Sequence, residues 1–148
     1  MRGYFGIGIF GTKTEINVGT LWRSAYQFGA SFIFTIAHRY KSQSSDTTKS
    51  WRHIPLIHFA DYESFEKSNF HDCSIVCIEF NQHSKSLIKS KHPERCIYLL
   101  GAEDNGLPEH ITNGKQTIEI PSIRQQSFNV AVAGSIVMYD RYIKKEEK

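Results

Sequence analysis

The strongest constraint on the fold is an alternation, along the chain, between short apolar runs and segments with helical patterning. Such alternation is typical of α/β proteins in which helices connect the strands of a mainly parallel sheet. Most of the runs have no polar face, as expected of strands covered by helices on both sides. We therefore predict strands at Tyr4–Phe10, Ser31–Ile36, Pro55–Phe59, Ser74–Glu79, Cys96–Leu100 and Gln116–Ile120.

Helical patterning lies between and after these runs, and it is clearest at the end of the chain. There Val130, Ala133 and Val137 form an apolar stripe, and Lys144 and Lys145 follow at the negative end of the helix dipole. No repeat or linker divides the sequence, so we expect residues 1–148 to form a single domain. The predicted helices are Thr20–Gly29, Tyr62–Lys67, Ser84–Lys89, Pro108–Thr112 and Asn129–Ile143.

Composition is that of an ordinary globular protein, with 40% hydrophobic and 22% charged residues and a net charge of +3 over 148 residues. The longest apolar stretch, residues 28–37, is about half the length of a membrane-spanning helix, and the start of the chain lacks a signal-peptide cleavage site. Three cysteines cannot form a complete set of disulfides, and we expect Cys73, Cys77 and Cys96 to be buried and structural. The sequence therefore predicts a cytoplasmic protein without a membrane segment.

A glycine-rich run, Gly6–Gly11, matches the letters of the dinucleotide-binding pattern G-x-G-x-x-G. That site needs the glycines after a strand, and an acidic residue about twenty positions later to bind the ribose. Here the glycines lie inside an apolar run, and no Asp or Glu occurs between Glu15 and Asp46. Lys13 is also one position too late for a phosphate-binding P-loop. We predict a closely packed buried strand, and a dehydrogenase remains a distant alternative.

Three further segments combine turn residues with polar side chains. In the first, Asn17 can cap a helix, Gly19 permits a tight turn, and Arg23 would lie in the first helical turn. An arginine there faces the positive end of the helix dipole, which is unfavourable without a partner. Both a functional arginine and a salt-bridged surface arginine fit this pattern.

The second segment, Leu99–Pro108, follows a predicted strand, at the edge where open α/β sheets bind ligands. Gly101 permits a close backbone approach and Gly106 a chain reversal, although an ordinary strand–turn–helix fits as well. In the third segment a strand ends at Pro121, and Ser127 and Asn129 precede the last helix. A plain helix cap is the alternative there.

Taken together, in this order, the segments resemble the motifs of the TrmH-like (SpoU) 2′-O-ribose RNA methyltransferases of the SPOUT superfamily. The family patterns are N-x-G-x-x-x-R, then G-x-E-x-x-G-[LI]-P, and finally I-P followed by S-[LMF]-N-V-[SA]-x-A. The matching residues are Asn17, Gly19 and Arg23, then Gly101, Glu103, Gly106, Leu107 and Pro108, and last Ile120, Pro121, Ser127, Asn129, Val130 and Ala133.

The resemblance implies a parallel sheet with a C-terminal trefoil knot, S-adenosylmethionine as the methyl donor, no metal, and a homodimer whose active site is shared across the interface. It implies that Arg23, Asn17, Glu103, Ser127 and Asn129 form the catalytic set. The implied cofactor-binding residues are Ile78, Leu100, Gly101, Ile120, Ser127 and Asn129.

By resemblance, Arg23 helps the ribose hydroxyl to lose its proton. A guanidinium with a pKa above about 12 is a poor base, so we favour a role in orienting an RNA phosphate and stabilising the developing alkoxide. The sequence leaves both roles open.

RNA is the implied partner, and we expect tRNA rather than rRNA because the chain resembles minimal relatives that methylate tRNA, at the wobble ribose or a D-loop guanosine. A basic segment is a candidate for contact with RNA phosphates or a solvated surface, and it contains Arg39, Lys41, Lys49 and Arg52. Two alternatives remain: an rRNA methyltransferase, and a catalytically inactive RNA-binding or assembly factor.

Overall fold

Strands that are apolar on both faces form the middle of the molecule. The computed structural model describes residues 3–12, 14–37, 53–68, 72–102 and 106–147. In this part of the chain, seven strands pair in the order β3-β2-β1-β6-β4-β7-β5, and every strand pair is parallel. The predicted mainly parallel α/β sheet is confirmed. The strands are β1 Tyr4–Phe10, β2 Phe32–Ile36, β3 Leu56–Phe59, β4 Ser74–Ile78, β5 Lys85–Ser86, β6 Arg95–Gly101 and β7 Gln116–Glu119.

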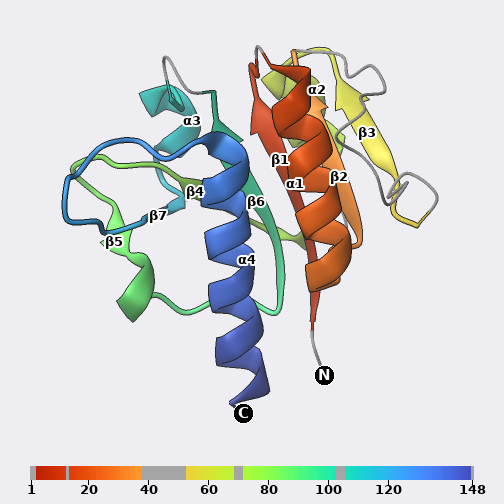
Figure 1. Cartoon of the computed structure of the whole chain (residues 1–148). Coiled ribbons are helices and arrows are strands. Elements are labelled where there is room, and N and C mark those ends of the chain that lie inside the picture. Colours follow the sequence, from red (N-terminus) through yellow and green to blue (C-terminus); the bar gives the residue numbers. More distant parts are fainter. Residues whose placement is uncertain (1–2, 13, 38–52, 69–71, 103–105, 148) are drawn as a thin grey trace.

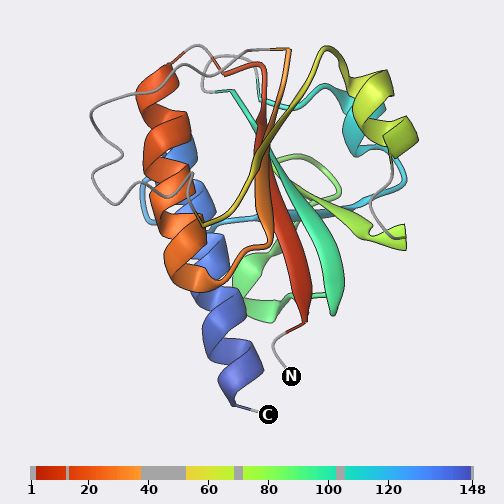
Figure 2. The ribbon, with the colours of Figure 1, turned by 90° about the vertical axis from the view of Figure 1, so that its right-hand side faces the viewer.

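Helices cover both faces of the sheet, so the fold has three layers (Figures 1 and 2). On one face α1, Glu15–Phe28, packs beside α4, Val130–Glu146. The other face carries the two short helices α2, Tyr62–Ser68, and α3, Glu109–Thr112. One turn of 3-10 helix, η3, follows β5 at Leu87–Lys89.

Each face of the sheet has its own hydrophobic core. Beneath α1 and α4, fully buried strand residues such as Ile7 and Leu100 pack with Leu21 and Val137. Beneath α2 and α3 the core is aromatic, and the rings of Phe34 and Phe65 stack with centroids 4.7 Å apart. This explains why the strands show no polar face.

The glycine-rich run lies within β1, as predicted. Gly6 pairs with Phe32 of β2, and Gly8 pairs with Phe34. A methyl group added at Gly6 would lie 2.3 Å from the Phe32 ring, and one at Gly8 would lie 2.4 Å from the Phe34 ring. Glycine is needed here because the two aromatic rings occupy the space of its missing side chain.

Two predicted helices differ from the structure. Helix α1 begins at Glu15 rather than Thr20, so Asn17 is not its cap and Arg23 lies beyond the first turn. The extended backbone of Thr14 precedes the helix, and Glu15 suits its positive end. The helix predicted at Ser84–Lys89 is wrong: its residues form β5, which pairs with β7, followed by η3. The Ser86 hydroxyl accepts the Ile88 N–H and caps only a 3-10 turn.

The three cysteines are buried and free, as predicted. Burial raises the pKa of the Cys77 thiol to about 11, so it stays protonated at neutral pH. Among the described residues, no group of three or more His, Cys, Asp or Glu side chains could hold a metal ion. Nor does this part of the chain contain a helix with the length and apolar character needed to cross a membrane.

Candidate functional site

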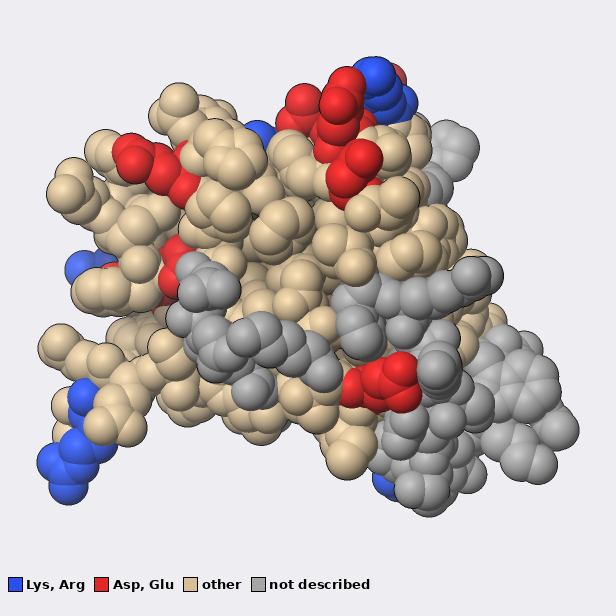
Figure 3. All heavy atoms as spheres, turned by 90° about the horizontal axis from the view of Figure 1, so that it is seen from above, with Lys and Arg blue, Asp and Glu red and all other residues tan. Residues whose placement is uncertain are grey.

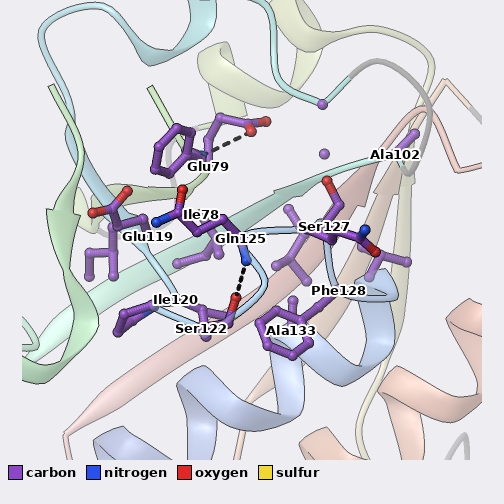
Figure 4. A pocket seen from close by; sticks show the side chains of 18 residues that line it. Ile78, Glu79, Ala102, Glu119, Ile120, Ser122, Gln125, Ser127, Phe128 and Ala133 are labelled. Atoms are coloured by element: carbon purple, nitrogen blue, oxygen red, sulfur yellow. Dashed lines mark hydrogen bonds between the residues drawn. The ribbon is translucent and has the colours of Figure 1, made fainter. Parts of the chain in front are cut away.

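A cavity of about 460 Å³ opens at the carboxyl ends of β4, β6 and β7 and is closed by segment 120–129, which leads into α4 (Figure 4). Its wall combines apolar side chains with a smaller number of polar ones, which is the usual make-up of a small-molecule site. The apolar residues include Ile78, Leu100, Ile118, Ile120, Val130 and Ala133. The polar residues are Glu79, Glu119, Ser122, Gln125, Gln126 and Ser127.

The loop after β6 forms one side of the cavity. Ala102 and Gly106 form an antiparallel bridge, in which the Gly106 N–H donates to the Ala102 carbonyl at 2.9 Å. A methyl group added at Gly101 would lie 2.5 Å from the carbonyl carbon of Gly106. Both ends of the loop therefore approach so closely that only glycine fits at position 101.

Segment 120–129 forms the opposite side and places Ser127 in the cavity wall (Figure 4). A turn inside it is held by the Gln125 N–H, which donates to the Ser122 hydroxyl at 3.2 Å. Gln125 has a φ of 54°, in the left-handed region that L-residues rarely adopt. The Ser127 side chain is exposed and has no hydrogen bond to any other described residue, so it is available to a ligand.

Asn129 connects the third motif to the first. Its Oδ1 caps α4 by accepting the N–H groups of Ala131 at 2.9 Å and Val132 at 3.2 Å. Its Nδ2 donates to Oδ1 of Asn17 at 3.0 Å, across 112 positions of sequence. Asn17 is only 6% exposed within α1. The helix-cap interpretation of Asn129 is therefore correct, and the same side chain also joins two motifs beside the cavity.

The predicted site residues divide into three groups. Five predicted cofactor-binding residues line the cavity together: Ile78, Leu100, Gly101, Ile120 and Ser127. Asn17 and Asn129 lie beside it, whereas Arg23 is exposed on α1 and does not line the cavity. The remaining predicted residues lie outside the described part of the chain: Glu103, Arg39, Lys41, Lys49 and Arg52.

Sequence reasoning missed Glu79, a half-buried residue at the end of β4. Its Oε2 accepts the Leu107 N–H at 2.7 Å, and its Oε1 accepts the Phe80 N–H at 3.0 Å. A signal was present, because Glu79 is an acidic residue at the carboxyl end of a predicted strand, where ligand sites form.

A second hollow, of about 380 Å³, lies between α1 and α4 and is mostly apolar. Tyr139 and Val132, which line it, are 53% and 46% exposed. The other lining residues are Thr20, Phe28, Ala131, Ser135 and Ile136. An exposed apolar surface of this kind is typical of a protein–protein contact.

Among the described residues, positive charge is sparse around the strand ends. Figure 3 looks onto this edge of the sheet, and the lysine and arginine side chains of the described residues lie toward its periphery. Acidic side chains of the described residues are visible on this face, and Glu79 and Glu119 line the cavity.

Fold and cavity together define an open parallel α/β protein with a cavity of ligand-binding size where the central strands end. Residues 5–139 match the model of the SpoU rRNA Methylase family. Because the match spans most of the chain, this protein belongs to that family. No curated protein sequence matches the chain significantly.

Solved structures share the fold at low sequence identity. A chain described in work on the 2-OH methylation of C/U34 on tRNA is 20% identical with a TM-score of 0.86, and the match covers 100% of both chains. An AdoMet-bound rRNA methyltransferase from Sinorhizobium meliloti is 22% identical with a TM-score of 0.83, covering 97% of this chain and 57% of that one. The A. aeolicus TrmH/SpoU tRNA modifying enzyme is 21% identical with a TM-score of 0.83, covering 97% and 76%.

Proposed function

We propose that the protein is an S-adenosylmethionine-dependent RNA 2′-O-ribose methyltransferase that acts on tRNA. The observation that carries the proposal is the cavity at the ends of β4, β6 and β7, with Ser127 in its wall and the Asn17–Asn129 hydrogen bond beside it. Family membership supports methyl transfer to RNA. The chain from the work on 2-OH methylation of C/U34 on tRNA matches this chain over the full length of both, which supports tRNA over rRNA.

The cavity suits S-adenosylmethionine in size and chemistry. Its volume of about 460 Å³ falls within the usual range of ligand sites, and Ile78, Leu100 and Ile120 offer apolar walls for an adenine ring. Bound there, the cofactor would supply an activated methyl group, so that the reaction needs no metal. The protein then has to hold both reactants in line and to assist loss of the hydroxyl proton.

We assign these tasks to the motif residues. Asn129, fixed by its hydrogen bonds to Asn17 and to the first turn of α4, and Ser127 shape the side of the cavity where the ribose enters. Arg23 orients an RNA phosphate and stabilises the alkoxide that forms as the hydroxyl loses its proton. In methyl transfer a carbon–oxygen bond forms, the carbon–sulfur bond breaks, and S-adenosylhomocysteine leaves as a neutral thioether.

The position of Arg23 supports a shared active site. Arg23 is exposed and does not line the cavity of its own chain, while the apolar hollow between α1 and α4 offers a surface for a second copy. We propose a homodimer in which α1 of one protomer brings Arg23 to the partner's cavity. The knotted C-terminal segment expected from the resemblance belongs to the same proposal, and chain tracing in a crystal structure tests it.

Methyl transfer tests the proposed activity. Labelled S-adenosylmethionine is incubated with bulk tRNA or rRNA, and the labelled ribose is mapped by nuclease digestion. We expect label in tRNA with the wild-type protein and none with Arg23→Ala. Lys67→Ala, which removes a 74% exposed cation on α2, should leave activity unchanged. Label only in rRNA would overturn the substrate, and no label in either RNA, with S-adenosylmethionine bound, would favour an inactive RNA-binding factor.

A mixing experiment tests the shared site. Arg23→Ala and Ser127→Ala protomers are each expected to be inactive, but a mixed dimer contains one site with an intact Ser127 and the partner's intact Arg23. Unfolding and refolding the two variants together should therefore restore part of the activity. If no activity returns although mixed dimers form, Arg23 acts within its own chain.

A further inference from the structure

Glu79 is an ionisable residue of the cavity wall that belongs to none of the three motifs and makes two side-chain hydrogen bonds. Both of its carboxylate oxygens accept backbone N–H groups, one from Phe80 and one from Leu107 (the Phe80 contact is drawn in Figure 4). The Leu107 contact, at 2.7 Å, has the short length of a charge-assisted hydrogen bond. It joins the end of β4 to a loop 28 positions further along the chain.

Three chain segments meet at this residue. The Glu79 N–H donates to the Ile118 carbonyl at 3.0 Å and thereby joins β4 to β7. The carboxylate then reaches the loop after β6, where it lies against the backbone of Gly106. A methyl group added at Gly106, which has a φ of 60°, would lie 2.3 Å from Oε2 of Glu79.

The contact lies at the far end of the second motif. Gly101 and Ala102 form the near end, where the Ala102 N–H donates to the Phe10 carbonyl at 3.0 Å. The bridge from Ala102 to Gly106 joins the two ends to each other. At the far end, the Glu79 side chain joins the loop directly to β4.

We propose that Glu79 is a positioning residue for the cofactor site: its carboxylate fixes the backbone of Gly106 and Leu107 against the sheet before the cofactor binds. The inference rests on the proposed function, because it assigns the cavity to S-adenosylmethionine. Fixing this wall in advance improves affinity, since a loop that must be ordered on binding reduces the free energy gained. Glu79 acts through the loop backbone, so it is not assigned a contact with the reacting atoms.

Two substitutions separate the hydrogen bond from the charge. Glu79→Ala removes both acceptors, while Glu79→Gln is similar in size, is neutral, and keeps one oxygen that can accept the Leu107 N–H. Asp61→Ala is the matched control, because Asp61 also accepts a backbone N–H at 2.7 Å, from Ser64, but at the start of α2 rather than at the cavity.

The experiment measures S-adenosylmethionine and S-adenosylhomocysteine affinity by titration calorimetry, and hydrogen exchange of the Leu107 amide without ligand. For Glu79→Ala we expect affinity for both ligands to fall about tenfold or more, with faster Leu107 exchange. Glu79→Gln should restore much of both. Asp61→Ala should bind as the wild type does, even if its melting temperature falls.

Several outcomes would overturn the inference. One is wild-type affinity in Glu79→Ala; another is weaker binding with unchanged Leu107 exchange. If Glu79→Gln lost affinity for cationic S-adenosylmethionine alone, the carboxylate would act by direct attraction to the sulfonium instead. If Glu79→Ala fails to fold, Glu79→Gln alone decides. The inference then requires that Glu79→Gln keep the Leu107 amide protected from exchange. It also requires that the affinities for the two ligands either stay unchanged or fall by the same factor. If the wild type binds neither ligand, the proposed function fails, while Leu107 exchange still reports whether Glu79 holds the loop.

Discussion

The two edges of the sheet are built differently. At the carboxyl edge, loops enclose a cavity, and side chains such as Ser127, Gln125 and Phe128 are exposed. At the amino edge, polar groups are buried in a network around Arg141, which is 2% exposed on α4. Stable packing is concentrated at the amino edge, whereas the carboxyl edge leaves polar groups available for a ligand.

The buried polar groups at the amino edge have several hydrogen-bond partners. Arg141 donates to the Pro93 carbonyl at 2.7 Å and to the Tyr98 hydroxyl at 3.2 Å, and its guanidinium lies over the Phe5 ring. His92 joins the same hydroxyl at 2.6 Å and a carboxylate oxygen of Asp140 at 2.7 Å. These bonds fix the second half of α4 on β6, which in turn orients the start of α4 at the cavity.

The largest effect on stability should come from Arg141→Ala. The change leaves a buried hydroxyl and a carbonyl without their charged donor and opens space over Phe5, so the free energy of unfolding should fall by about 3 kcal/mol or more. Arg23→Ala is the control: this arginine is exposed, and its loss should cost less than about 0.5 kcal/mol. Chemical denaturation measures both.

For activity the ranking should be reversed: Arg23→Ala should have the larger effect and Arg141→Ala the smaller one. Well below its melting temperature, Arg141→Ala should still bind S-adenosylmethionine, whereas Arg23→Ala should be stable and inactive. The contrast between the two edges would fail if Arg141→Ala, while folded, lost cofactor binding without losing stability.

Asn129 belongs to the carboxyl edge and should show a mixed effect. Asn129→Ala removes the cap of α4 and the hydrogen bond to Asn17, so we expect a loss of about 1–2 kcal/mol and a large fall in methyl transfer. Asn129→Asp keeps an oxygen that can cap the helix but has no N–H to donate to Asn17. It should therefore be nearly as stable as the wild type and still be impaired. Full activity in Asn129→Asp would show that only the cap matters.

Much of the fold could be predicted from local sequence patterns. The apolar runs located six strands, and the position of the glycines inside the run Tyr4–Phe10 correctly predicted a closely packed strand. Helix α1 was misplaced because Asn17 and Gly19 are residue types that favour caps and turns, and nothing local reveals that Asn17 is held by Asn129. Strand β5 escaped prediction because two residues carry no periodicity, and only pairing with β7 defines it.

The candidate site was predictable where a motif carried it. Turn glycines and the strand–loop–helix order identified Gly101, Ser127 and Asn129 as neighbours of one edge, and the structure brings them together. Glu79 was missed because its role depends on a contact with Leu107, which only the order of β4 beside β6 creates. The position of Glu79 at the end of a predicted strand was a local signal for a site, but its contact with Leu107 was not visible in the local sequence.

A smaller, pH-dependent effect is expected at the amino edge. Burial lowers the pKa of His92 below its ordinary value of 6.5, although the Asp140 hydrogen bond opposes this shift and Lys144 and Arg141 add to it. The unfolded chain therefore takes up a proton at higher pH than the folded one. The contribution of neutral His92 to the free energy of unfolding is fully present above pH 6.5. It is lost as the pH falls from 6.5 through the lower pKa of His92 in the folded protein.

Melting temperature measured between neutral and mildly acidic pH tests this. The wild type should lose stability as the pH falls through this window, and His92→Gln, which does not titrate, should lose less. His83→Gln, at an exposed turn, is the matched control and should follow the wild type. An unchanged slope in His92→Gln would show that other groups cause the acid sensitivity.

The smallest effect should come from relieving strain at the carboxyl edge. Gln125 holds a φ of 54°, which costs an L-residue about 1 kcal/mol and costs glycine little. Gln125→Gly removes that strain but gives the unfolded chain more freedom, so stability should rise by less than about 1 kcal/mol. Gln126 does not have a positive φ, so Gln126→Gly relieves no strain. It only increases the conformational freedom of the unfolded chain and should therefore lower the melting temperature. If both substitutions lowered the melting temperature equally, the Gln125 side chain would itself stabilise segment 120–129. The carboxyl edge would then be packed more firmly than its exposed side chains indicate.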